Sequence, residues 1–207
     1  MERAMPPYPQ AEQELMAQNL RAAREWVSSR QDVLLHVTDT EYAYYPYYDE
    51  LFRTVRPAML VHTGDLADEY KAGRREEDRA PWTASVPLML GCMRRSGAAR
   101  LVICPGNNDL PDTLAALAPD MEIVPRNTVL SFSGMTFAVC HEIHLIDTDA
   151  PMVLYGHGFT GEPYPRSILR QDGRRYYNAM WGVTLFCPAT GESLLLDRPE
   201  QDPKKPT

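Results

Sequence analysis

Three apolar stretches of this sequence each run directly into acidic or amide side chains, and this repetition limits the possible folds more than any other feature. The stretches are "VLLHVTD" (33–39), "AMLVHTGD" (58–65) and "ARLVICPGN" (99–107). A short apolar run that ends in turn residues is typical of a fully buried strand. Helix-forming segments at 48–56 and 84–96 separate the three runs. Strands that alternate with helices predict an α/β domain with parallel strands.

The second half of the chain has a different pattern. Residues 127–142 read as two strands joined by a Ser-Gly pair, which is a hairpin signal. Another short strand is expected at 152–158, and several more between 174 and 199, the last two joined near "PATGE". Because no linker-like break separates these patterns, we predict a single α/β domain over 1–207 with a mixed sheet system.

The two ends of the chain differ from the centre. Residues 1–10 contain three prolines and are expected to form a loose arm. Residues 11–30 are rich in helix formers and predict an amphipathic helix, with Leu15, Leu20, Ala23 and Val27 near one face. Residues 200–207, "QDPKKPT" after Glu200, are expected to be disordered.

The composition excludes several classes of protein. The formal net charge is −7, and the charged run at 73–79 carries both signs, so nucleic acid is not the expected partner. No stretch of about twenty apolar residues and no signal-peptide core are present, which favours a cytoplasmic protein without a membrane partner. Its four cysteines are far apart in the sequence and are expected to be reduced and mostly buried. An acidic protein that handles anions needs a local positive centre, such as a metal ion.

The ends of the predicted strands supply a set of metal-ligand side chains. Asp39, Asp65 and Asn107 follow the first three strands, and functional groups gather outside the carboxyl ends of parallel strands. Two carboxylates so close together repel each other unless a divalent cation neutralises them. His141 and His157 each follow a later apolar run. Mixed Asp, Asn and His ligands suit Mn²⁺, Fe or Zn²⁺ better than Ca²⁺.

These motifs, in this order, resemble the calcineurin-like metallophosphoesterase family. That family has D-x-H, then G-D-x-x-D, then G-N-H-[DE], then a lone His, then G-H-x-H. Here the series is "DTE" (39–41), "GDLAD" (64–68), "GNND" (106–109), His141 and "GHGF" (156–159). The resemblance spans 33 to about 198 and is strongest to the small bacterial phosphodiesterase-like members. It implies two packed mixed β-sheets flanked by helices, a four-layer α/β sandwich.

The resemblance also implies two divalent metal ions, with Mn²⁺ expected and Fe, Zn²⁺ or Mg²⁺ as alternatives. Asp65 would bridge the two ions. Asn107, His141 and His157 would complete one site, and all three are present.

The other site would need Asp39, a His at position 41 and a His at position 159, where this chain has Glu41 and Phe159. Glu can ligate a metal and Phe cannot, so we expect this site to hold its ion more weakly. His144 lies in the short segment between His141 and His157 and is a candidate replacement ligand.

The family's activity implies a metal-dependent phosphoesterase, expected to be a phosphodiesterase, that hydrolyses a small phosphate ester or nucleotide through a metal-bound hydroxide. Asn108 stands where the family has its general-acid His, and Asp68 could position the cluster or only cap a helix. One alternative is a divergent, non-catalytic member that keeps the fold and one metal and binds a ligand or partner. Another is an unrelated α/β protein whose strand ends are structural.

Several other features have plain structural interpretations. His36 and His62 lie within predicted strands and are expected to be core or supporting residues. The aromatic run at 42–48 could stack on a substrate ring, or it could pack against the N-terminal helix. Four arginines could reach a phosphate, but we favour a solvated surface position for them. They are Arg74, Arg75, Arg166 and Arg170.

Overall fold

The computed structural model of this protein describes residues 8–157, 168–171 and 173–199. The predicted arm lies almost entirely outside the described residues, as do Phe159 and the predicted tail at 200–207. The α-helices are α1 Gln10–Val27, α2 Tyr45–Val55, α3 Arg79–Arg95 and α4 Pro111–Leu117. The 3₁₀ helices are η1 Tyr42–Tyr44, η2 Glu76–Asp78 and η3 Ile143–Leu145.

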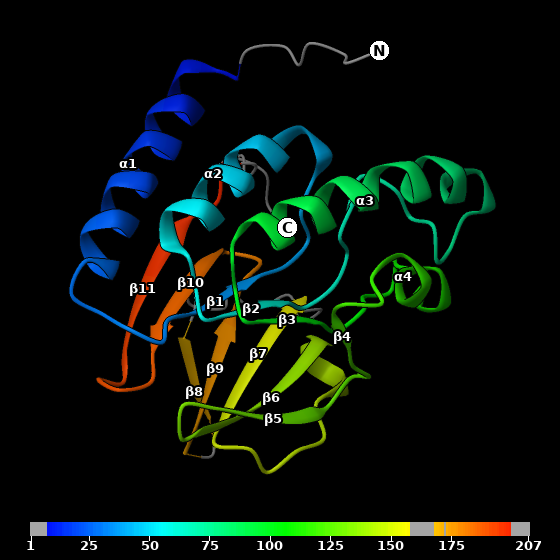
Figure 1. The fold of residues 1–207 in the computed structure, drawn as a ribbon. Coiled ribbons are helices and arrows are strands. Elements are labelled where there is room, and N and C mark those ends of the chain that lie inside the picture. The colour runs from blue at the N-terminus through cyan, green and yellow to red at the C-terminus, as the bar shows by residue number, and fades with distance from the viewer. Residues whose placement is uncertain (1–7, 158–167, 172, 200–207) are drawn as a thin grey trace.

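The strands form two mixed sheets, one of six strands and one of five (Figure 1). In the order β11-β10-β1-β2-β3-β4, the first sheet contains β1 Leu34–Val37, β2 Met59–His62, β3 Arg100–Ile103, β4 Glu122–Ile123, β10 Gly182–Cys187 and β11 Glu192–Asp197. In the order β5-β6-β7-β9-β8, the second sheet contains β5 Thr128–Phe132, β6 Met135–Glu142, β7 Met152–His157, β8 Ile168–Gln171 and β9 Arg174–Asn178.

The register of the first sheet brings the carboxyl ends of three strands level. β1, β2 and β3 are parallel, and Val37 pairs with His62, which pairs with Ile103. In the second sheet β6 and β7 are also parallel, and Glu142 pairs with His157. Residues that follow these strands therefore leave each sheet side by side, which is the condition for a shared site.

The two sheets pack face to face, and the helices cover the far face of the first sheet (Figure 1). A buried cluster joins the inner faces of the sheets, with Leu34 and Val61 from one and Val139 and Leu154 from the other. The four helices pack against the opposite face of the six-stranded sheet through residues such as Leu51. The predicted fold class is confirmed.

The outer layer of the second sheet is thin. Among the described residues, Ile143 and Ile146, from η3 and the position after it, pack against Val153, Tyr155 and Tyr176 on that face. This agrees with the short spacing between β6 and β7, which leaves no room for a longer helix. In the part of the chain that the structure describes, the outer helical layer on this side of the sandwich is thus reduced to a 3₁₀ turn.

The sequence placed most elements correctly and some boundaries wrongly. The strand predicted at 33–39 is the shorter Leu34–Val37, because the residues after it turn out of the sheet. The helix predicted at 84–96 begins five residues earlier, at Arg79. β4 and β8 were not predicted. The Ser133-Gly134 hairpin is confirmed, and both residues have the positive φ that such a turn requires.

The N-terminal helix buries most of the predicted face, since Ala23 is fully buried and Leu20 and Val27 pack against the core. Its buried residues are Met16, Asn19 and Ala23, whereas Leu15 is only half-buried. The amide nitrogen of Asn19 donates to the hydroxyl of Tyr47 at 2.9 Å and to the carbonyl of Asp197 at 2.7 Å. A polar residue therefore holds α1 to α2 and β11, and a search for apolar periodicity cannot find it.

The aromatic run belongs to the core. Tyr45, Tyr47 and Tyr48 are buried in α2, and the ring of Tyr44 stacks on Tyr8 with centroids 5.4 Å apart. Tyr44 also donates to Glu12 of α1. Packing against the N-terminal helix was the correct interpretation for Tyr44 and Tyr47.

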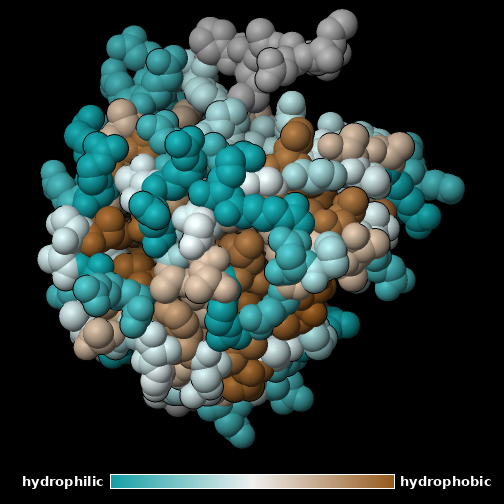
Figure 2. All heavy atoms as spheres, in the orientation of Figure 1, coloured by the Kyte–Doolittle hydropathy of each residue, from teal (hydrophilic) through white to brown (hydrophobic). Residues whose placement is uncertain are grey.

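Exposed large hydrophobic side chains are few on the described part of the surface. Figure 2 shows brown hydrophobic areas interrupted by teal and white residues on the face in view. The large hydrophobic residues exposed among those described are Tyr42, Leu88 and Val129. Within the described residues no helix combines the length and the apolar character needed to cross a bilayer. All four cysteines are buried free thiols, as predicted.

Replacing Asn19 with Ala is expected to lower the free energy of unfolding by about 1–3 kcal/mol, because the Tyr47 hydroxyl and the Asp197 carbonyl lose a buried donor. Urea denaturation followed by circular dichroism measures this. Gln18→Ala, at the neighbouring exposed position, is the matched control and is expected to change stability by less than about 0.5 kcal/mol. Equal effects of the two substitutions would contradict the proposed anchoring role.

Candidate functional site

Two buried carboxylates leave the ends of β1 and β2 together. Asp39 and Asp65 both have positive φ, 48° and 57°, a conformation that Asp tolerates better than most residues but that still costs energy. The Asp39 N–H donates to the carbonyl of Gly64 at 2.9 Å, and the Thr40 N–H donates to the carbonyl of Asp65 at 3.0 Å. These bonds tie the two turns together and present the two carboxylates to one point.

His141 of β6 completes a compact group with the two carboxylates. One ligand atom each from Asp39, Asp65 and His141 lies within 4.8 Å of the others. Their exposed fractions are 3%, 2% and 3%. Because His141 comes from the second sheet, the group lies where the two sheets meet. The predicted convergence of the first, second and fourth motifs is thus present.

The orientation of His141 suits a metal ligand. Its Nδ1 donates to the carbonyl of Thr63 at 2.6 Å, which fixes the ring. Its Nε2 then faces Asp65, with 3.4 Å to Oδ2. Metal-ligating histidines usually donate their other ring N–H to a carbonyl or carboxylate in this manner. The ring is therefore oriented so that Nε2 faces Asp65, where it can hold a proton or, once deprotonated, ligate a cation.

The electrostatics of the group favour a cation. Burial raises the pKa of Asp39 and of Asp65. Burial lowers the pKa of His141, but the charge of Asp39 and the hydrogen bond and charge of Asp65 outweigh it and raise this pKa to about 10. Positive charge is thus held at the imidazole by two carboxylates. A divalent cation bound there must replace that proton.

Asn107 and His157 lie beside this group. One terminal atom of the Asn107 amide is 3.2 Å from Nε2 of His141. If that atom is nitrogen, the amide donates to a neutral imidazole; if it is oxygen, both groups direct lone pairs at a shared cation. The His157 ring lies almost parallel to His141, with centroids 5.8 Å apart. Burial, and then the charge of His141, lower the pKa of His157, which favours the neutral form that a metal needs.

Asn108 and Asp68 support Asp65. The backbone N–H of Asn108 donates to Oδ1 of Asp65 at 2.9 Å, and its amide nitrogen donates to Oδ2 at 2.5 Å. The same nitrogen lies 3.2 Å from Oδ1 of Asp68, which also accepts from Lys71 at 2.5 Å. Both oxygens of Asp65 are therefore held by one residue. These contacts are those of positioning residues, and a catalytic role for Asn108 or Asp68 stays a prediction.

The predicted second metal site is less complete in the described residues. Glu41 is half-buried and lies outside the compact group. Burial raises the pKa of Glu69, and the charge of Glu41 adds a smaller effect in the same direction. Phe159 lies outside the described residues, and His144 is exposed on η3. Asp39 and the shared Asp65 are in place for this site, and the rest of its ligand set stays a prediction.

Sequence reasoning gave no role to Asp109, which fixes the second and third motifs. This buried carboxylate accepts from the N–H groups of Asp65 at 2.7 Å, Leu66 at 3.1 Å and Gly106 at 2.8 Å. Burial and the charge of Asp65 raise its pKa to about 6, although the three hydrogen bonds oppose this shift. Asp109 is visible in the sequence as the last residue of "GNND". Its hydrogen-bond partners are backbone N–H groups, however, and only the fold brings them near it.

A second missed residue is Arg198, after β11. Its buried guanidinium donates to the carbonyl of Thr38 at 3.0 Å and also to the carbonyl of Asp39. Its positive charge lowers the pKa of Asp39, against the larger effect of burial. No local pattern in the sequence links position 198 to position 39.

The glycines of two motifs allow close approach to the carboxylates. A Cβ atom on Gly106 would lie 2.1 Å from Oδ1 of Asp65. A Cβ atom on Gly156 would lie 2.1 Å from Oγ1 of Thr38 and 3.0 Å from Oδ2 of Asp39. The two distances of 2.1 Å are far inside van der Waals contact, so these positions accept no side chain without displacement of the site.

His36 and His62 are supporting residues, as predicted. Nε2 of His36 lies 2.9 Å from the hydroxyl of Thr63, and burial lowers its pKa to about 3. Nδ1 of His62 accepts from the N–H of Gly64 at 3.1 Å, and its Nε2 lies 3.1 Å from the hydroxyl of Thr40. Burial lowers the pKa of His62 as well. Both neutral rings therefore order the turns that carry the carboxylates.

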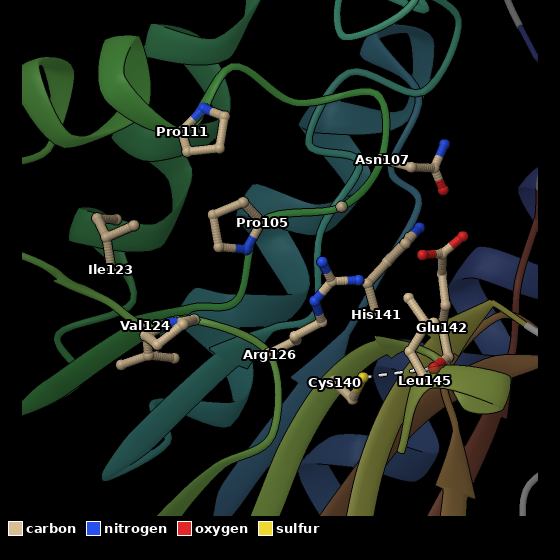
Figure 3. A pocket seen from close by; sticks show the side chains of 12 residues that line it. Pro105, Asn107, Pro111, Ile123, Val124, Arg126, Cys140, His141, Glu142 and Leu145 are labelled. Atoms are coloured by element: carbon tan, nitrogen blue, oxygen red, sulfur yellow. Dashed lines mark hydrogen bonds between the residues drawn. The ribbon is translucent and has the colours of Figure 1, made fainter. Parts of the chain in front are cut away.

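A pocket of about 540 Å³ opens beside the group. Asn107, His141 and Glu142 lie at one end of it, and Ile123 and Val124 lie at the other (Figure 3). Three proline rings and the exposed Arg126 also line it. The pocket thus joins an apolar wall to the candidate metal ligands.

Comparisons with known proteins agree with this arrangement. The sequence profile of the family described as calcineurin-like phosphoesterase matches residues 33–198. No curated protein matches the chain. One solved crystal structure superposes with a TM-score of 0.54 at 8% identity, covering 80% of this chain and 98% of its own. That likeness concerns the fold alone.

Two further solved structures are more distant in shape. A nuclease MPE from Pseudomonas putida has a TM-score of 0.40 at 18% identity, covering 78% of this chain and 87% of its own. The protein of unknown function AQ665 from Aquifex aeolicus has a TM-score of 0.35 at 12% identity, covering 71% and 89%.

Metal affinity is expected to rise with pH. The pKa of His141, near 10, means that its proton is bound between pH 6 and pH 8, so an incoming ion must displace it. Each displaced proton strengthens apparent binding by up to about tenfold per pH unit. Calorimetric titration with Mn²⁺ in two buffers of different ionisation enthalpy measures the proton release. Affinity that is constant from pH 6 to pH 8 would contradict the ligand role of His141.

Proposed function

This chain belongs to the calcineurin-like phosphoesterase family, and we propose that it is a metal-dependent phosphodiesterase that hydrolyses a small phosphate ester. The observation that carries the proposal is the convergence of Asp39, Asp65 and His141 at the meeting of the two sheets. Two buried carboxylates facing one oriented imidazole have little structural purpose unless a cation joins them.

The donor set fits divalent transition metals. Asp65, Asn107, His141 and His157 offer mixed oxygen and nitrogen ligands for one ion. Asp39, with Glu41 and the shared Asp65, offers oxygen ligands for a second and weaker one. Bound divalent ions would supply Lewis acidity and lower the pKa of an attacking water. Mn²⁺ is the proposed metal because oxygen-rich ligand sets favour it over Zn²⁺.

The residues of the chain would do the remaining work by positioning and by excluding water. Asn108 holds both oxygens of Asp65, and burial keeps water from the carboxylates. The pocket beside His141 could receive the organic part of the ester against its apolar wall. An amide at position 108 does not act as a general acid at neutral pH. Esters whose leaving group needs little protonation are therefore the proposed substrates.

A second candidate function is a binding protein that keeps the fold and one metal. Two observations favour it. Glu41 lies outside the compact group, and the amide nitrogen of Asn108 is already bonded to Asp65 rather than open to a substrate. Such a protein would bind Mn²⁺ and phosphate without hydrolysing an ester.

Asp65→Asn is expected to weaken Mn²⁺ binding by more than about 100-fold, because a ligand contributes more than the 10–100-fold typical of a residue that only supports one. Hydrolysis of bis(p-nitrophenyl) phosphate should fall in parallel. Metal analysis after dialysis and the chromogenic assay measure both. Asp112→Asn, at an exposed position in α4, is the matched control. Unchanged metal binding in Asp65→Asn would exclude a bridging role.

Phe159→His, combined with Glu41→His, is expected to lower the Mn²⁺ concentration that gives half-maximal hydrolysis. The two substitutions restore imidazoles where the family has them, so the weaker site should fill more readily. Phe159→Leu is the control, since it keeps an apolar side chain. Wild-type protein that already retains two ions through dialysis would show that another residue replaces the missing ligand. If neither wild type nor variant hydrolyses the ester, the binding-protein candidate is preferred.

A further inference from the structure

The charged segment at 67–80 is not a freely solvated loop, because its centre is docked on the candidate metal site. The Gly73 N–H donates to the carbonyl of Asn108 at 2.9 Å. A Cβ atom on Gly73 would lie 2.4 Å from the carbonyl oxygen of Asn107. Only glycine permits this approach, so position 73 fixes the segment against the third motif.

Arg74 is thereby held beside a candidate ligand. Its Nη2 lies 2.9 Å from one terminal atom of the Asn107 amide, and the other terminal atom of that amide is 3.2 Å from Nε2 of His141. The backbone N–H of Arg74 donates to the carbonyl of Lys71 at 2.8 Å, which orders the turn. Arg74 is also exposed, so its guanidinium can meet a molecule from solvent.

The Asn107 amide cannot serve a cation and Arg74 with the same oxygen. Turned toward Arg74, the oxygen accepts from the guanidinium and the nitrogen faces Nε2 of His141, which can accept from it only when the imidazole is neutral. If the oxygen instead turns toward a cation at His141, the amide nitrogen faces Arg74. Two hydrogen-bond donors, the amide and the guanidinium, then face each other. The guanidinium then needs an acceptor from another source, and phosphate oxygens are its preferred partners.

We propose that Arg74 binds the phosphate of the substrate at the Asp39–Asp65–His141 group, and that the Asn107 amide couples this binding to the cation. The inference rests on the proposed function, since it requires a cation at His141. Arg74 would hold a non-bridging phosphate oxygen in a geometry that a guanidinium fork provides and an ammonium does not.

Calorimetric titration of the Mn²⁺-loaded protein with inorganic phosphate tests the proposal, with Arg75→Ala as the matched control. Arg75 is the neighbouring exposed arginine of the same turn. Arg74→Ala is expected to weaken phosphate binding by about tenfold or more, as the loss of a charged hydrogen bond does. Arg75→Ala should bind phosphate as wild type does, and Arg74→Lys should restore part of the affinity.

Mn²⁺ affinity without phosphate supplies the second measurement. Removing a positive charge beside the site should leave the Mn²⁺ affinity of Arg74→Ala equal to that of wild type or a few-fold higher. A fall in phosphate affinity without a fall in Mn²⁺ affinity therefore distinguishes a phosphate-binding residue from a structural one. An Arg74→Ala variant that loses both affinities, or that matches Arg75→Ala in both, would overturn the proposal. Wild-type protein that binds no Mn²⁺ would overturn the proposed function and this inference together.

Discussion

The burial of two carboxylates against one imidazole is the interaction on which the rest of this structure depends. Asp39 and Asp65 are almost inaccessible, and both occupy left-handed backbone conformations that cost energy. Two buried anions at this separation repel each other unless positive charge is supplied. His141 supplies part of it, and the level carboxyl ends of the parallel strands make the arrangement possible. The fold thus has to bring the strand ends level, and the site has to supply positive charge so that the two carboxylates can be buried there.

Much of the molecule near this group serves to hold it rather than to react. Asp109 gathers three backbone N–H groups from the second and third motifs, and Asn108 holds the oxygens of Asp65. Neutral histidines order the turns from within the strands, while Gly106 leaves space for the carboxylate it faces. A strained, charged site is stable only when its surroundings determine its geometry in this way.

The sequence predicted the parts of this site that follow from strand ends, and it missed those that depend on tertiary contacts. Asp39, Asp65 and His141 each come at the end of an apolar run, so topology alone brings them together. Arg198 and Asp109 bind backbone groups, which leave no trace in residue type. Arg74 was assigned to a solvated surface because the mixed charge of its segment hid the docking that Gly73 permits. Periodicity likewise missed the polar contacts that orient α1.

The charge of the chain makes this local arrangement necessary. A protein with a formal net charge of −7 repels an anionic ester at long range, and the two buried carboxylates add to that repulsion nearby. Attraction must then come from a few centres close to the reacting phosphate. Divalent ions can provide most of it, and in the proposed arrangement they would also turn the Asn107 oxygen away from Arg74. Binding of the cation would thus make the site positive and also leave the Arg74 guanidinium without its Asn107 acceptor, so that it can bind phosphate. Substrate affinity would therefore depend on prior metal binding.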